Sequence, residues 1–185
     1  VILVCCVIPG ENDGDLGGIV EYAKAHMPAV KGVYFQPVSY FGIYPEAHTP
    51  RITIPGVIRK LAEQCADISM DDFGPGTYEH PQCSFQGVYI KDRKGTLRAM
   101  THFGPKGANQ GDLHRMRAFL RTAWRPSDQN TLTVGGMAFQ DSSNIDLIRL
   151  RRCSIQIIGR GGTLVPLCGK YLSGCGGERL LPGID

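Results

Sequence analysis

The sequence lacks the features that would place it in a membrane or on nucleic acid. Its longest fully apolar run, Val1–Ile8, is far shorter than the roughly 20 residues that a membrane-spanning helix needs. The same run has neither the basic flank nor the small-residue cleavage site of a signal peptide. The formal net charge is only +3, and no long Lys/Arg run forms a stripe that could follow phosphates. We therefore expect no membrane, no nucleic-acid partner and a cytoplasmic location.

A regular disulfide pattern is also missing, although the 185 residues include seven cysteines. The number is odd, Cys5 and Cys6 are adjacent, and the other cysteines are scattered, which is not typical of a secreted disulfide framework. Two interpretations remain: some cysteines are buried as small apolar residues, and others bind a metal or a cluster. The hydrophobic fraction of 42% and the charged fraction of 20% are typical of a globular protein.

The first third of the chain predicts a strand, a helix and a second strand. Val1–Ile8 is apolar at every position and rich in β-branched residues, which favours a strand buried on both faces of a parallel sheet. Asp15 is a candidate cap for a helix over Leu16–His26, and Gly32–Val38 reads as the next strand. This order predicts a βαβ unit with parallel strands. Because so buried a strand needs neighbours, we expect the chain to begin inside a domain.

The following segments alternate between helical and strand patterns. Either Thr49 or Thr53 is a candidate cap for a helix over Pro55–Ala66, on whose apolar stripe Cys65 is expected to be a core residue. Turn chemistry between two short strand patterns predicts a hairpin near residue 92. The further predicted elements are strands at Ser84–Ile90 and Thr96–Met100, helices at Asp112–Trp124 and Asn144–Arg152, and a last hairpin of Cys153–Ile158 with Thr163–Cys168.

The last hairpin carries the main metal-site hypothesis. A two-residue turn at Arg160–Gly161 predicts that Cys153 lies directly opposite Cys168, with Cβ atoms about 4.5–5.5 Å apart. Two thiolates at that distance can serve one metal or one iron–sulfur cluster, although a pair of buried thiols at a strand end fits too. His80 and Cys83, spaced i, i+3, resemble half of a zinc site. A non-catalytic zinc-binding module built from His80, Cys83, Cys153 and Cys168 is therefore an alternative to an enzyme.

Polar residues follow the two predicted parallel strands. Asn12 lies in the turn after the first strand, and Gln36 and Ser39 lie at the end of the second. Ligands of α/β proteins bind at the carboxyl ends of such strands, so these side chains are candidates for holding a small molecule. Each is equally a candidate turn-former, and for Asn12 the turn is the better interpretation.

Several long and unusual segments point to a known family. They are PGENDGDLGGIV, VKGVYFQPVSYFG, RITIPGVIRKLAEQ, EHPQCSFQG, GGMAFQDSSNIDLIRLRRCSIQI and GTLVPLCGKYL. Together they resemble the late βα units and C-terminal region of radical SAM proteins, in the branch that contains the TrsS type and the archaeal tetrahydromethanopterin methylase type. The resemblance covers nearly the whole chain and is interrupted at about residues 91–128.

The resemblance implies an α/β fold in which residues 1–70 form the last βα units of a partial (β/α) barrel. Residues 71–185 would then form a small α+β, cysteine-bearing C-terminal extension. It also implies S-adenosylmethionine (SAM) and a [4Fe–4S] cluster as cofactors. Asn12, Gln36 and Ser39 are the candidate SAM contacts, and Cys83, Cys153 and Cys168 are the candidate ligands of an auxiliary cluster. Tyr78 and Ser154 stand where relatives carry further cysteines, so the auxiliary site would lack ligands. Ile43 replaces an Arg that is common in relatives, which would weaken a polar contact near the SAM pocket.

In the family, a CxxxCxxC motif supplies the three ligands of the catalytic cluster, and no such motif occurs in these 185 residues. The resemblance therefore implies a fragment of a radical SAM iron–sulfur enzyme, inactive alone. Its parent would cleave SAM to a 5′-deoxyadenosyl radical for a modification or methylation reaction. The expected partners are a small-molecule or peptide substrate and the missing N-terminal half.

Overall fold

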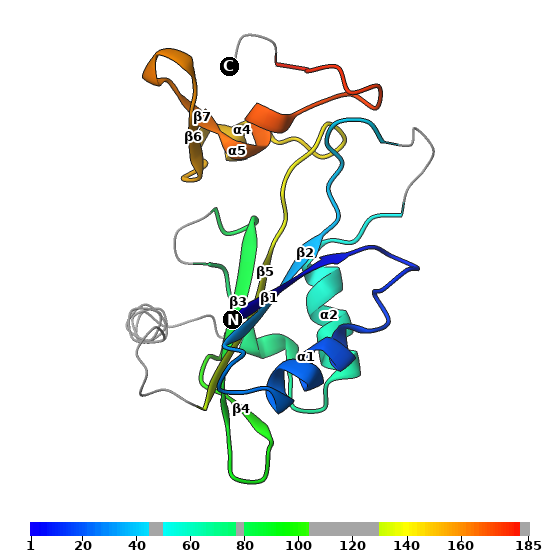
Figure 1. Ribbon diagram of the computed structural model, residues 1–185, viewed down its shortest axis with the longest axis vertical. Helices are drawn as coiled ribbons and strands as arrows, with labels where there is room; N and C mark the ends of the chain where they lie inside the picture. The colour runs from blue at the N-terminus through cyan, green and yellow to red at the C-terminus, as the bar shows by residue number, and fades with distance from the viewer. Residues whose placement is uncertain (45–49, 77–79, 104–129, 182–185) are drawn as a thin grey trace.

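A computed structural model describes residues 1–44, 50–76, 80–103 and 130–181 of the chain. Its main feature is one five-stranded mixed sheet with the strand order β1-β2-β5-β3-β4 (Figure 1). The strands are β1 (Ile2–Val7), β2 (Gly32–Pro37), β3 (Ser84–Lys91), β4 (Leu97–Ala99), β5 (Thr131–Met137), β6 (Gln156–Ile158) and β7 (Leu164–Pro166). The α-helices are α1 (Leu16–Ala25), α2 (Ile54–Gln64), α4 (Leu147–Arg151) and α5 (Leu167–Tyr171), and 3₁₀ turns lie at Met70–Asp72 and Arg160–Gly162.

The predicted βαβ unit is confirmed. Strands β1 and β2 are parallel neighbours, with Cys5 opposite Phe35, and α1 connects them. The hairpin of β3 and β4 also forms as expected, with Tyr89 opposite Ala99. Strand β5 was not predicted, although it occupies the centre of the sheet, parallel to β2 and antiparallel to β3. Its place between β2 and β3 follows from long-range pairing, which a local pattern does not report.

The mixed sheet is compatible with an α/β protein. The described strands form an open sheet, and they do not close into a barrel. Strands from both sides of the expected boundary at residue 70 share this sheet, since β5 pairs with β2. The partial barrel and the two-part division of the chain stay predictions.

Strand β1 differs from its predicted environment. It lies at the edge of the sheet, and no described strand pairs with its outer side. Helices α1 and α2 both cover the same face of the sheet (Figure 1). On the opposite face, which has no described helix (the helix-free face), Ile2 is 45% exposed and Val4 is 62% exposed. The expectation that Val1–Ile8 is buried on both faces is therefore wrong for the described structure, because an apolar run does not report how many layers cover it.

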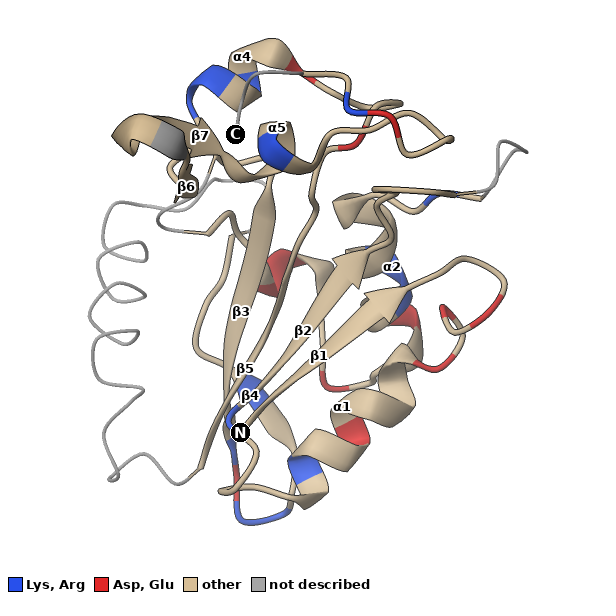
Figure 2. Cartoon of the chain, turned by 45° about the horizontal axis from the view of Figure 1, so that its top comes forward, with Lys and Arg blue, Asp and Glu red and all other residues tan. Residues whose placement is uncertain are grey.

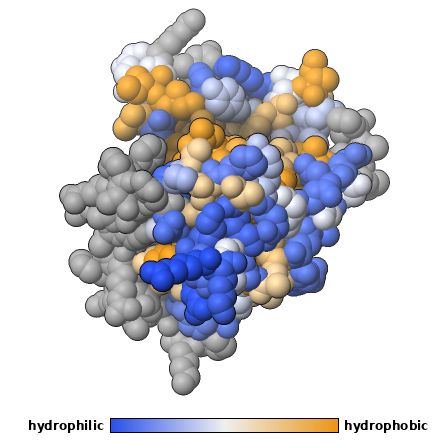
Figure 3. Space-filling model, turned by 60° about the horizontal axis from the view of Figure 1, so that its bottom comes forward, coloured by the Kyte–Doolittle hydropathy of each residue, from blue (hydrophilic) through white to orange (hydrophobic). Residues whose placement is uncertain are grey.

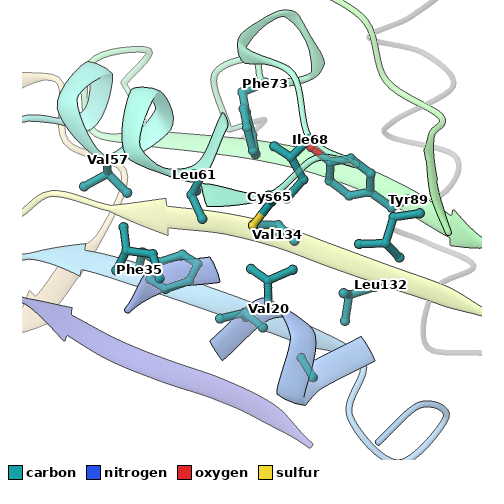
Figure 4. Packing of buried hydrophobic residues seen from close by; sticks show 14 of the residues in the cluster. Val20, Phe35, Val57, Leu61, Cys65, Ile68, Phe73, Tyr89, Leu132 and Val134 are labelled. Atoms are coloured by element: carbon teal, nitrogen blue, oxygen red, sulfur yellow. The ribbon is translucent and has the colours of Figure 1, made fainter. Parts of the chain in front are cut away.

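The core lies between the sheet and its two helices. Val20 of α1, Leu61 of α2, Phe35 of β2 and Leu132 of β5 are fully buried and point toward one another (Figure 4). Cys65 belongs to the same cluster and is 5% exposed, which confirms it as a core residue. Burial raises the pKa of the Cys65 thiol to about 11. Burial of this kind contributes about 25 cal/mol for each Å² of apolar surface removed from water.

The two helices begin differently. Helix α2 starts at Thr53, one of its two candidate caps, whose Oγ1 accepts a hydrogen bond from Gly56 N at 3.3 Å, and Pro55 occupies the first turn. Asp15, by contrast, makes no side-chain capping bond to α1. The Gly17 N–H instead donates to the Oε1 of Gln64 at 2.9 Å, which ties the start of α1 to the end of α2.

Charged residues are excluded from the sheet centre. Strands β1, β2 and β5 contain none, and the described Lys, Arg, Asp and Glu lie on helices, on loops and on the outer strands β3 and β4, which carry Lys91 and Arg98 (Figure 2). Hydrophilic residues cover most of the face seen in Figure 3, and apolar ones gather toward its upper end. None of the described helices has the length and apolarity to cross a membrane. The predicted helix over residues 112–124 lies outside the described residues.

Candidate functional site

The last hairpin forms in a register one residue away from the predicted one. Ile157 lies opposite Val165, and the loop is a three-residue 3₁₀ turn rather than a two-residue turn. Gly161 and Gly162 both take positive φ values, 70° and 79°, which glycine adopts without strain and which allow the longer turn. Cys153 precedes β6 and Cys168 lies in the first turn of α5, so the predicted cross-strand pairing of these two cysteines is wrong.

The two cysteines nevertheless meet in one small cavity. Cys153 and Cys168 line it together with Cys83, which precedes β3, and with His80. Burial raises the pKa of the Cys168 thiol, and the nearby Cys153 and Cys83 raise it further. The Cys168 Sγ accepts a hydrogen bond from Gln140 N at 3.3 Å. All four residues of the predicted zinc or cluster site are therefore brought together from three separate parts of the chain.

This donor set fits a soft metal site in its chemistry. Cysteine sulfur and imidazole nitrogen are ligands of zinc, and cysteine sulfur holds iron–sulfur clusters. The cavity has a volume of about 20 Å³, which is close to the space of one water molecule, so as packed it has room for a single ion. A four-iron cluster fits only if the side chains move apart. Among the described residues, no three His, Cys, Asp or Glu side chains are arranged to hold a metal ion together.

An arginine that the sequence did not indicate lies beside the cysteines. The Nη2 of Arg149, in α4, donates a hydrogen bond to the Sγ of Cys83 at 3.0 Å. Helix α4 is set in place by Asp146, whose Oδ1 accepts hydrogen bonds from the N–H groups of Ile148 and Arg149. The Nε of Arg149 is buried and has no hydrogen-bond partner among the described residues. Arg149 thus lies beside the cysteine cavity, and its Nε–H is unpaired among the described residues.

A larger cleft of about 620 Å³ lies on the other side of Arg149, at the carboxyl ends of the parallel strands β2 and β5. Its walls come from the segments after β2 and β5, the start of α2, the segment before β3, and α4. The lining residues are Pro37, Val38, Ser39, Arg51, Ile52, Thr53, Ile54, Pro55, Pro81, Gln82, Ala138, Phe139, Asn144 and Arg149. The position agrees with the usual ligand-binding edge of α/β sheets.

The three candidate SAM residues lie in different surroundings. Ser39 lines the cleft, and its Oγ donates to Phe139 O at 2.9 Å. Gln36 is half-buried, and because it alternates with Phe35 it lies on the helix-free face, opposite Cys6. Asn12 closes its own turn: its Oδ1 accepts from Ile8 N at 2.8 Å, and its Nδ2 donates to Cys6 O. Of the three, only Ser39 lines the cleft, and their role toward SAM stays a prediction.

A buried carboxylate fixes one wall of the cleft. Asp141 is fully buried and accepts hydrogen bonds from Tyr40 N at 2.9 Å, from the Nη1 of Arg51 at 2.7 Å and from Ser143. Burial opposes ionisation of Asp141, but these hydrogen bonds outweigh it and lower the pKa. The Arg51 guanidinium also lies over the Tyr40 ring, 4.7 Å from its centroid. The network joins the segment after β2 to the segment after β5.

Comparison with known proteins gives one relationship. No protein-family model matches the chain. The chain is 37% identical over 107 residues to a 7,8-dihydro-6-hydroxymethylpterin dimethyltransferase of Methanocaldococcus jannaschii. The match covers 56% of this chain and 21% of the relative, so the chain spans about one fifth of that protein's length. This similarity supports a relation of the chain to radical SAM methyltransferases.

Proposed function

We propose that this chain is part of a radical SAM enzyme that carries out a methylation or a related modification. The observation that carries the proposal is the 37% identity to a pterin dimethyltransferase over more than half of the chain. The described part of the sheet is compatible with it, because α1 and α2 cover one face and no described helix covers the other. Because the relative is a dimethyltransferase of a 7,8-dihydropterin, a reduced pterin is the first small molecule to test as substrate.

In this proposal the chain's own residues shape the cofactor pocket and exclude water from it. Gln36 presents an amide on the helix-free face, and Ser39 contributes a hydroxyl at the cleft. Asn12 acts by holding the turn after β1. When bound in the whole enzyme, SAM and its [4Fe–4S] cluster would supply the radical chemistry, while the protein supplies binding and orientation.

The three cysteines of the small cavity, Cys83, Cys153 and Cys168, are proposed to hold an auxiliary metal centre. Their convergence from three parts of the chain supports this role, as does the presence of His80 in the same lining. The volume of about 20 Å³ favours a second candidate, a mononuclear zinc site that stabilises a non-catalytic module. In both cases the same cysteines are the ligands.

Anaerobic reconstitution of the full chain with iron and sulfide, followed by metal and acid-labile sulfide analysis, tests the proposal. We expect bound iron and sulfide, and we expect both to be lost in a Cys153→Ala/Cys168→Ala variant. The matched control is Cys175→Ala, because Cys175 does not line the cavity. If the chain instead binds one zinc ion and no sulfide, the result would support the zinc-binding module and contradict the iron–sulfur cluster. Neither metal in the wild-type chain would contradict both candidates.

A further inference from the structure

The cleft beyond β2 and β5 contains a positive charge that no described acidic group matches. Its lining includes Arg51 and Arg149 but no described Asp or Glu. The charge of Arg51 is matched by Asp141, at 2.7 Å. Arg149, in contrast, forms no ion pair with the described residues. The cleft therefore has one cationic side chain in its wall that lacks an anionic partner in the described part of the chain.

The hydrogen bonding of Arg149 is also incomplete. Its Nη2 donates to the thiol of Cys83, which is a weak acceptor, and its buried Nε has no partner among the described residues. A buried donor without an acceptor is destabilising, and native proteins leave few such groups. An anionic group in the cleft would match the charge of the Arg149 guanidinium, since guanidinium groups match carboxylate and phosphate oxygens.

The other walls of the cleft favour the same kind of ligand. Helix α2 is 11 residues long and opens on the cleft at Thr53–Pro55, where the positive end of its dipole favours anions. The amides of Gln82 and Asn144 provide neutral polar contacts, and Phe139 provides apolar surface. A mostly apolar cleft with a few directed polar groups is typical of a small-molecule site. Helix α4, which carries Arg149, lies across the end of the sheet (Figure 2).

We propose that this cleft binds a small molecule through a carboxylate or phosphate group that contacts Arg149. The cleft is an oxyanion site, and Arg149 is its principal cation. The proposal does not rest on the function proposed above, because only the cleft, its charge and its hydrogen bonding enter the argument. It assigns a role to a side chain that neither the metal hypothesis nor the SAM hypothesis uses.

The test follows the arginine Nε–H signals of the full chain by ¹H–¹⁵N NMR. The Arg149 signal is the one that is lost in an Arg149→Gln variant. Inorganic phosphate and sodium acetate are titrated separately at constant ionic strength, with sodium chloride as the reference salt. We expect the Arg149 signal to shift in a saturable way with at least one of the two anions. A stronger response to phosphate identifies a phosphorylated ligand, and a stronger response to acetate identifies a carboxylate.

Two further variants separate binding from folding. Arg149→Gln should weaken binding of the preferred anion at least tenfold, and Arg149→Lys should fall between this variant and the wild type. Arg151→Gln is the matched control, because Arg151 is an exposed residue of the same helix and does not line the cleft. It should bind as the wild type does. The proposal is overturned if the wild-type Arg149 signal shifts with neither anion, or if Arg151→Gln weakens binding as much as Arg149→Gln.

Discussion

Arg51 and Asp141 form an ion pair of 2.7 Å in which the carboxylate is fully buried and one third of the arginine side chain is exposed. The pair connects residues that are 90 positions apart, one before α2 and the other after β5. Tyr40 adds a backbone hydrogen bond to the carboxylate and an aromatic ring beneath the guanidinium. The wall of the cleft is therefore held by electrostatic contacts.

This pair predicts a specific response to acid. The pKa of Asp141 is lower in the folded protein than in the unfolded chain, where it is about 3.9. The folded carboxylate binds its proton less readily, so its stabilisation is complete above pH 5 and is lost as the pH falls through the folded pKa. Asp141→Asn should lower the free energy of unfolding at pH 7 by about 1–3 kcal/mol and should flatten its decline below pH 5.

Urea denaturation between pH 3 and pH 7 measures this response. The control is Glu63→Gln, which changes an exposed carboxylate of α2 and should leave the pH profile close to that of the wild type. If Asp141→Asn and the wild type lose stability in parallel between pH 5 and pH 3, the buried carboxylate is not the group that titrates.

Two adjacent glycines in α1 predict effects of opposite sign. A Cβ on Gly17 would lie 2.9 Å from both the Cβ and the backbone O of Gln64, whereas a Cβ on Gly18 would meet nothing within 4 Å. Gly17→Ala should therefore destabilise the protein by about 1–3 kcal/mol through overpacking of α1 against α2. Gly18→Ala should stabilise it by about 0.4–1 kcal/mol, since alanine is the better helix former.

Thermal unfolding of the two single variants checks this pair. The prediction concerns the sign of each change, so each variant serves as the control of the other. Equal effects of the two substitutions would mean that α1 does not approach α2 as closely as the hydrogen bond between Gly17 and Gln64 indicates.

The cysteines should differ in reactivity. Burial raises the pKa of Cys65 to about 11, so at pH 8 only about one Cys65 thiol in 1,000 is ionised, and the side chain is 5% exposed. Cys6, also in an apolar segment, is exposed. A thiol-directed alkylating reagent should modify Cys6 in the folded protein and Cys65 only after denaturation. Peptide mass spectrometry reports both sites, and modification of Cys65 as fast as Cys6 would contradict its place in the core.

The sequence predicted best those features that depend on local chemistry. Helix α2 with its Thr53 cap and the parallel pairing of β1 with β2 are encoded by capping residues, apolar periodicity and turn residues close together in the chain. Strand β5 was missed because its place between β2 and β3 comes from distant partners. The exposure of Val4 is not predicted, because an apolar run does not distinguish an edge strand from a central strand.

The candidate site was anticipated only in part. The sequence predicts Cys83, Cys153 and Cys168 as one group, and they line one cavity, although the predicted hairpin register that pairs the last two is one residue off. The sequence does not identify Arg149 or Asp141 as site residues, because their partners are distant in the chain. Cys83 is 66 positions from Arg149, and Arg51 is 90 positions from Asp141. Such contacts arise from the packing of α4 and the segment after β5 onto the end of the sheet.

The central claim is that Cys83, Cys153 and Cys168 form one metal site, and a cobalt titration of the full chain tests it most directly. Cobalt(II) occupies the sites of softer divalent metals, and its bonds to thiolates give an intense absorption in the near ultraviolet. We expect this absorption to reach its end point at one cobalt per chain, to fall in Cys83→Ala, Cys153→Ala and Cys168→Ala, and to persist in Cys175→Ala. An absent thiolate band, or a band unchanged by all three substitutions, would contradict the account.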